Sequence, residues 1–177
     1  VQKLIDLFAS FGARQPQEIG TARELAGRMA RLTHLIRTST LEILLKGEAS
    51  ATLTGLLEAF RETVLPGLTH EDFSDMYAQT LAYGLFAARV NFKGTALFTR
   101  RDAAHAIPRT NPLLQTLFYT LTGPDLSDEP YVNFVDELAQ LLAYADMPQI
   151  LAEFGTQVRA EDPIVHFYET FLAQYNP

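Results

Sequence analysis

Few residues of this 177-residue sequence have the types and spacing that enzyme chemistry requires. The four histidines lie far apart, at His34, His70, His105 and His166. His70-Glu71 begins like the His-x-x-x-His pattern of zinc enzymes, but no second histidine follows four residues later. The sequence has no cysteine, so it offers no thiolate ligand for zinc and no thiol nucleophile. We therefore expect isolated histidines at the surface or at helix ends, and no metal site.

Motifs that bind phosphate or modify DNA are also incomplete. None of the three lysines follows a glycine, so the sequence contains no Gly-x-x-x-x-Gly-Lys phosphate loop. Pro124-Asp125 could begin a nuclease motif, but that motif needs a later lysine and Lys93 is the last one. Asn111-Pro112 half-resembles the Asn-Pro-Pro-aromatic motif of amino-methyltransferases, yet the second proline and the aromatic residue are missing. We interpret Asn111 as a helix cap, and we expect no catalytic or cofactor-binding residue in this chain.

The charges are unevenly distributed along the chain. The net charge of −7 disfavours a free-standing binder of nucleic acid or of membrane surfaces. Residues 112–177 carry ten acids and one arginine, whereas residues 21–46 carry five basic and two acidic residues. Residues 89–111 carry five basic residues and one acid. If the chain contacts DNA phosphates, we expect the two basic segments to do so. The candidate contacts are Arg89, Lys93, Arg100, Arg101 and Arg109; alternatively, these arginines pair with the acidic final third.

The elements that position these residues are predicted to be helices. Thr21 and Glu24 form a capping-box pattern, and Gly47 is suited to end the helix that follows. A second helix is predicted from about Ala51 to Leu65, and a third begins after Thr69.

The third predicted helix should lie at the centre of the molecule. Residues 81–88 are apolar on all sides, which is typical of a helix buried in a bundle. Thr80, Gly84 and Ala87 are small and share one face, so a neighbouring group can approach closely there.

The remaining cap and proline residues also predict helix starts. Further starts are predicted at Thr99, Asn111-Pro112, Glu129-Pro130, Asp146 and Asp162-Pro163. Only residues 95–99 weakly suggest a strand. The longest apolar run has eight residues, whereas a membrane span needs about 20. We predict an all-α fold, a single compact bundle of about eight or nine helices over residues 1–177, with no membrane association.

Several segments resemble a known family. Residues Tyr77 to Arg89, with the sequence Tyr-Ala-Gln-Thr-Leu-Ala-Tyr-Gly-Leu-Phe-Ala-Ala-Arg, are similar to a segment of bacterial restriction–modification polypeptides of types IIG and ISP. Residues 98–105 and 110–112 are similar to the segments that follow it there. The ending, residues 162–177, looks like the stretch that leads into the methyltransferase domain. The resemblance extends from about Leu25 to the end.

This resemblance implies a non-catalytic helical spacer between an N-terminal nuclease or motor and an adenine-specific DNA methyltransferase. The parent enzyme is expected to act in the cytoplasm, to methylate adenine N6 with S-adenosylmethionine, and to need Mg²⁺ for cleavage. The chain begins at Val1 and stops at Pro177, which we interpret as excision from that larger polypeptide.

Two further expectations concern partners and rival functions. The last helix is expected to dock on the methyltransferase through exposed aromatic residues, with Phe167, Tyr168 and Tyr175 as candidates. Alternatively, all three belong to the core. Rival functions are a DNA-contacting module built on residues 89–111, and a small self-contained enzyme. An enzyme would need a pocket with converging polar groups, which this sequence does not indicate.

Overall fold

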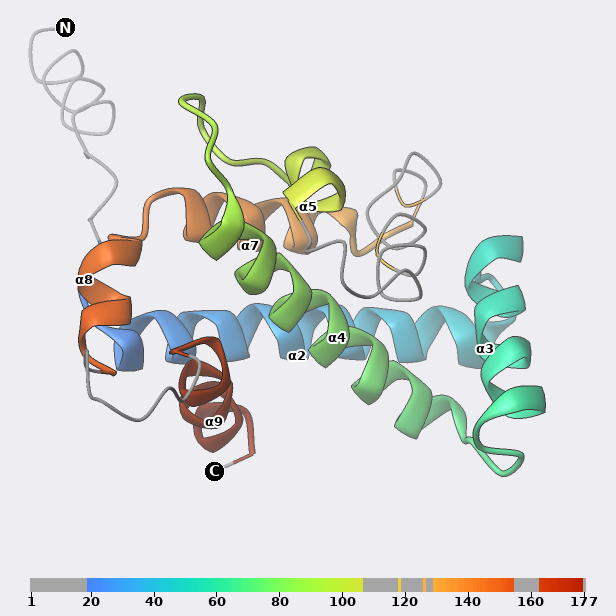
Figure 1. Ribbon diagram of the computed structural model, residues 1–177. Helices are drawn as coiled ribbons and strands as arrows, with labels where there is room; N and C mark the ends of the chain where they lie inside the picture. Colours follow the sequence, from blue (N-terminus) through green and yellow to red (C-terminus); the bar gives the residue numbers. More distant parts are fainter. Residues whose placement is uncertain (1–18, 107–117, 119–125, 127–128, 155–162, 177) are drawn as a thin grey trace, which may run out of the picture.

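The computed structural model describes residues 19–106, 118, 126, 129–154 and 163–176, and within these ranges the chain is helical (Figure 1). Seven helices lie in this part of the chain: α2 (Ala22–Lys46), α3 (Ala51–Thr63), α4 (His70–Asn91), α5 (Arg100–Ala106), α7 (Val132–Ala143), α8 (Met147–Ala152) and α9 (Pro163–Tyr175). The described residues contain no strand, only an isolated bridge between Ile19 and Ala145. The all-α prediction is confirmed. The predicted count of eight or nine is higher than the seven found, and the helix expected from Asn111-Pro112 lies outside the described residues.

Helix α2 begins and ends at the predicted residues. The Glu24 amide donates to Thr21 Oγ1 at 3.2 Å, which supplies the N-cap. Gly47 adopts a left-handed φ of 70°, and its amide donates to the Leu44 carbonyl. The Glu24 carboxylate differs from the capping-box expectation, because it accepts a hydrogen bond from Arg28 at 2.7 Å.

Helices α3, α4 and α5 also begin at local side-chain caps, whereas α7 begins without one. Ser50 Oγ accepts the Leu53 amide at the start of α3, and Thr69 Oγ1 accepts the Asp72 amide at the start of α4. At α5, the Thr99 amide instead donates to the Asp102 carboxylate at 2.9 Å. Each cap satisfies an amide that the first helical turn leaves without a carbonyl partner.

Helix α4 is the centre of the bundle, as predicted. It packs against α2, α5, α7 and α9, and it crosses α2 diagonally in Figure 1. Leu81, Leu85 and Phe86 are fully buried. At Gly84, a β-carbon would lie 1.9 Å from Cε2 of Phe118, so the missing side chain makes room for that ring. The close approach predicted for the small face of this helix is therefore confirmed at Gly84.

Helix α2 runs most of the length of the bundle, with α3 at one end and α8 and α9 near the other (Figure 1). The first and last described helices, α2 and α9, pack directly against each other. At the start of the described chain, the Ile19 carbonyl accepts the Asp146 amide at 3.0 Å and the Ala22 amide donates to Glu153 at 3.1 Å. Among the described helices, none is both long enough and apolar enough to span a membrane.

Candidate functional site

The basic residues proposed to bind phosphate do not have a common environment. Arg89 is half-buried at the end of α4, and its Nε donates to the Leu142 carbonyl of α7 at 3.0 Å. Burial lowers the pKa of its guanidinium. Arg100 is 6% exposed, and its Nε lies 2.9 Å from Oδ1 of Asp136, also on α7. Arg100 thus pairs with an acid of the final third, as in the alternative interpretation, whereas Arg89 binds a backbone carbonyl there.

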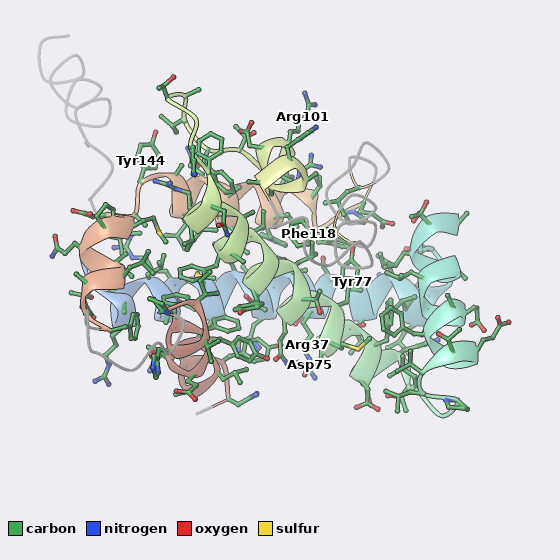
Figure 2. The ribbon with its side chains drawn as sticks, in the orientation of Figure 1. Arg37, Asp75, Tyr77, Arg101, Phe118 and Tyr144 are labelled. Carbon is green, nitrogen blue, oxygen red and sulfur yellow. The ribbon has the colours of Figure 1, made fainter. Side chains whose placement is uncertain are left out.

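Two of the remaining candidates are free of such burial. Lys93 and Arg101 are exposed, and Figure 2 shows the Arg101 side chain pointing away from the bundle. Arg109 lies outside the described residues. Contact with DNA therefore stays a prediction for Lys93 and Arg101, whereas Arg89 and Arg100 have structural partners.

The aromatic residues of α9 lie mostly inside the molecule. Phe167 and Tyr175 are each 1% exposed, because they lie on the helix face that packs on the core. The Phe167 ring stacks on Phe86, with centroids 3.8 Å apart. Tyr168 is half-buried against Tyr83. The expectation of exposed anchors is thus wrong for Phe167 and Tyr175, and these two belong to the core.

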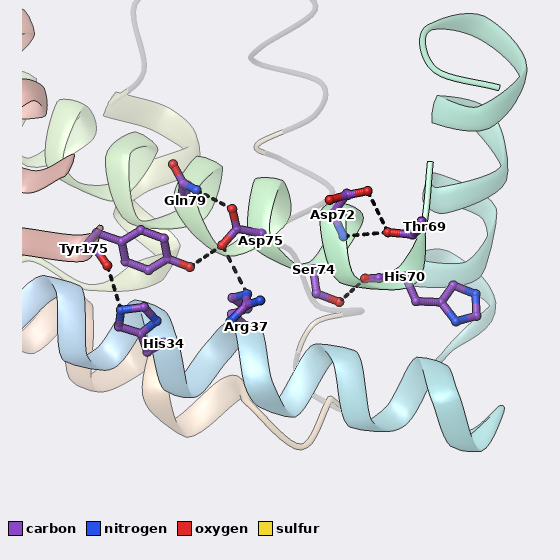
Figure 3. Close-up of polar contacts among 9 residues, drawn as sticks. All are labelled: His34, Arg37, Thr69, His70, Asp72, Ser74, Asp75, Gln79 and Tyr175. Carbon is purple, nitrogen blue, oxygen red and sulfur yellow. Dashed lines mark hydrogen bonds and ion pairs between the residues drawn. The ribbon is translucent and has the colours of Figure 1, made fainter. Parts of the chain in front are cut away.

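A polar cluster, which we call the Asp75 cluster, joins α2, α4 and α9 (Figure 3). It consists of His34, Arg37, Asp75, Gln79 and Tyr175. The Tyr175 hydroxyl donates to Asp75 Oδ1 at 2.6 Å, and Arg37 Nε lies 3.2 Å from the same oxygen. Gln79 Nε2 donates to Oδ2 at 2.7 Å. Both carboxylate oxygens are thus engaged, and Asp75 links α4 to α2 and α9.

His34 completes this cluster from α2. Its ring stacks on the Tyr175 ring at 4.1 Å, and its Nε2 lies 3.0 Å from the Tyr175 carbonyl oxygen. Burial, with the hydrogen bond to Asp75 next, raises the pKa of the Tyr175 hydroxyl. The tyrosine therefore stays protonated and keeps donating. This cluster could not be recognised in the sequence, because its members come from three helices that are distant in the chain.

A second polar pair lies deeper in the core. The hydroxyls of Tyr77 and Tyr131 are 2.9 Å apart and satisfy each other. Burial raises the pKa of both tyrosines, and the nearby carboxylate of Glu129 acts in the same direction. Glu129 itself is 5% exposed. A neutral hydroxyl pair of this kind stabilises packing and offers no nucleophile at neutral pH.

Helix α7 has one groove on each side. One has a volume of about 610 Å³ and lies between α7 and the segment around Phe98. The other has a volume of about 490 Å³ and lies between α7 and α2. Within the described ranges, no group of three or more His, Asp or Glu side chains is arranged to hold a metal ion.

The chain matches no family model, no curated protein and no solved structure.

Proposed function

We propose that this chain is a non-catalytic helical connector of a restriction–modification DNA methyltransferase. It would position the methyltransferase domain relative to an N-terminal nuclease or motor. The observation that carries this proposal is that Ile19 and Tyr175, near the two ends of the described bundle, are both fixed to the same body of helices. A packed bundle transmits position and orientation, whereas a flexible linker does not.

The segments that carry the resemblance, residues 77–89 and 98–105, support this proposal because they form packed parts of the bundle. The first segment forms the buried middle of α4, and the second spans the cap of α5 and most of that helix. Tyr77, Leu81 and Phe86 contribute buried surface and no reactive group. The parent would supply the chemistry, with S-adenosylmethionine for methylation of adenine N6 and Mg²⁺ for cleavage, in the cytoplasm.

The test uses the longer polypeptide that contains this chain. With S-adenosylmethionine and duplex DNA, we expect methyl transfer to adenine and cleavage at a narrow set of distances from the methylated base. Phe167→Leu removes the aromatic stack that helps to hold α9 on α4, so it should scatter the cleavage positions and leave methylation intact. Val165→Leu, at a half-exposed position of the same helix, is the control.

Two results would contradict the connector. One is the absence of methyl transfer to adenine by the parent polypeptide. The other is a Phe167→Leu variant whose α9 is measurably loosened, by hydrogen exchange, but whose cleavage positions are unchanged.

The second candidate function is contact with the DNA backbone through residues 89–111. The exposure of Lys93 and Arg101 favours it. The chain should then retard duplex DNA in a gel at low salt and release it as salt rises. Lys93→Glu with Arg101→Glu should abolish the retardation. Equal loss in Arg23→Glu with Arg31→Glu, two exposed arginines of the other basic segment, would show that the binding is not specific to residues 89–111.

A further inference from the structure

The outer side of α7 is a polar ridge with a groove along each flank. Asn133, Asp136, Glu137 and Gln140 are exposed on this ridge. Leu97 and Phe98 line the groove on the α5 side, and Leu32 and Leu141 line the groove on the α2 side. Glu137 and Gln140 line both grooves, so the two grooves belong to one continuous surface.

The charge of this surface is negative at one point. Arg100, in the wall of the first groove, is neutralised by Asp136 at 2.9 Å. Arg28, in the wall of the second groove, is neutralised by Glu24 at 2.7 Å. Glu137 is exposed and forms no ion pair within the described part of the chain. Its carboxylate is thus the uncompensated charge that both grooves share.

The flanks of the ridge present both polar and apolar side chains, and they are already in place. Leu97 is 57% exposed in the segment before α5, and Leu32, Leu141 and Tyr144 are half-buried on the other flank. The bonds from Arg89 and Arg100 fix α7 against α4 and α5, so the walls need little ordering when a partner binds. Apolar side chains around one exposed carboxylate favour a partner that is itself amphipathic.

We propose that the outer ridge of α7 and its two grooves are a docking site for a basic, amphipathic segment of a protein. A lysine or arginine of that segment pairs with Glu137, and its apolar side chains enter the grooves. Nucleic acid is the disfavoured partner, because its phosphates would meet the uncompensated carboxylate of Glu137. The inference goes beyond the proposed function, and it holds or fails whether or not the parent methylates DNA.

The test places the photo-crosslinking amino acid p-benzoylphenylalanine at Gln140, between the two grooves, in the natural full-length polypeptide. After irradiation, crosslinked peptides are identified by mass spectrometry. We expect crosslinks to one peptide outside residues 19–176 that carries lysine or arginine beside apolar residues. Glu137→Lys should reduce them more than about ten-fold, because like charges would then meet across the interface. Glu62→Lys, the same change at an exposed position of α3, should leave them unchanged.

A charge exchange separates docking from chance proximity. Replacing the basic residue of the crosslinked peptide by glutamate should restore crosslinking in the Glu137→Lys background. The proposal is overturned if crosslinks form only within residues 19–176 or to nucleic acid. It is also overturned if no crosslink forms, or if Glu137→Lys leaves crosslinking unchanged.

Discussion

At residue 84, the missing β-carbon lets the Phe118 ring pack directly against α4. Gly84→Ala would place a methyl group 1.9 Å from a ring atom, so the ring or the helix must shift. We expect overpacking to cost about 1–3 kcal/mol. Alanine gains roughly 1 kcal/mol over glycine in helix propensity. The cost exceeds this gain because the ring is held against the helix. The expected result is a lower free energy of unfolding, measured by urea denaturation.

Gly55 in α3 is the matched control for that substitution. A β-carbon there would meet nothing within 4 Å. Gly55→Ala should therefore raise the free energy of unfolding by about 0.4–1 kcal/mol. If Gly84→Ala stabilised the protein as much as Gly55→Ala, the close contact between Gly84 and Phe118 would be refuted.

The buried pair Tyr77 and Tyr131 predicts a loss of stability at alkaline pH. Folding raises the pKa of both hydroxyls above the ordinary value of 10.0, so the unfolded chain loses these protons at a lower pH than the folded chain. The free energy of unfolding should be at its full value below about pH 10 and should fall as the pH rises further. Urea denaturation at about pH 9 and pH 11 measures this fall.

A double variant isolates the contribution of this pair. Tyr77→Phe with Tyr131→Phe should make the free energy of unfolding fall less steeply at alkaline pH. The reason is that two of the tyrosines whose pKa is raised by folding are then absent. Some fall should remain, because the pKa of Tyr175 is also raised. An unchanged slope in the double variant would show that the pair does not titrate differently in the folded state.

The surroundings of a residue could be predicted from the sequence where they depend on neighbours within the same helix. The close approach at Gly84 was predictable, because three small residues share one helix face. The Asp75 cluster was not, because Asp75 and Tyr175 are 100 residues apart and their meeting depends on how α9 packs. The roles of Arg89 and Arg100 were similarly undetermined, since sequence alone leaves both phosphate binding and internal pairing open.

At the scale of elements, α9 is attached mainly through its buried aromatic face. Phe167→Ala should lower the free energy of unfolding by about 3–5 kcal/mol, because a fully packed ring leaves a cavity. Val165→Ala, on the exposed side of α9, should change it by less than about 0.5 kcal/mol. Thermal unfolding followed by circular dichroism measures both. Similar losses in the two variants would mean that α9 does not pack through this face.

The positions of the helices were largely predictable, because caps and stop residues act within a few residues of the chain. Thr21, Thr69 and Asp146 each accept an amide of the first turn that follows. The boundaries were less exact. The helix predicted from Glu129-Pro130 begins at Val132, after a turn in which the Val132 amide donates to the Glu129 carbonyl. Pairing between helices was not predictable, since amphipathic faces do not specify their partners.

For the whole molecule, the connector proposal requires a rigid body. The chain has no cysteine, so spin labels can be placed at Arg23→Cys and Ala173→Cys, both exposed, without other changes. Double electron–electron resonance should give one narrow distance distribution, because α2 and α9 pack directly together. Adding Phe167→Ala should broaden it. A broad distribution in the unaltered background would contradict the rigid connector.

The packing of α2 against α9 also affects how the chain is made. Helix α2 leaves the ribosome before α9, so the apolar face that α9 covers has no partner until Tyr175 has been synthesised. At about 5–20 residues per second, that interval is on the order of ten seconds. During it, Leu25, Met29 and Ile36 belong to a helix whose tertiary partners are incomplete. We therefore expect the nascent chain to expose these residues to chaperones that bind apolar helices, although the finished molecule buries them completely.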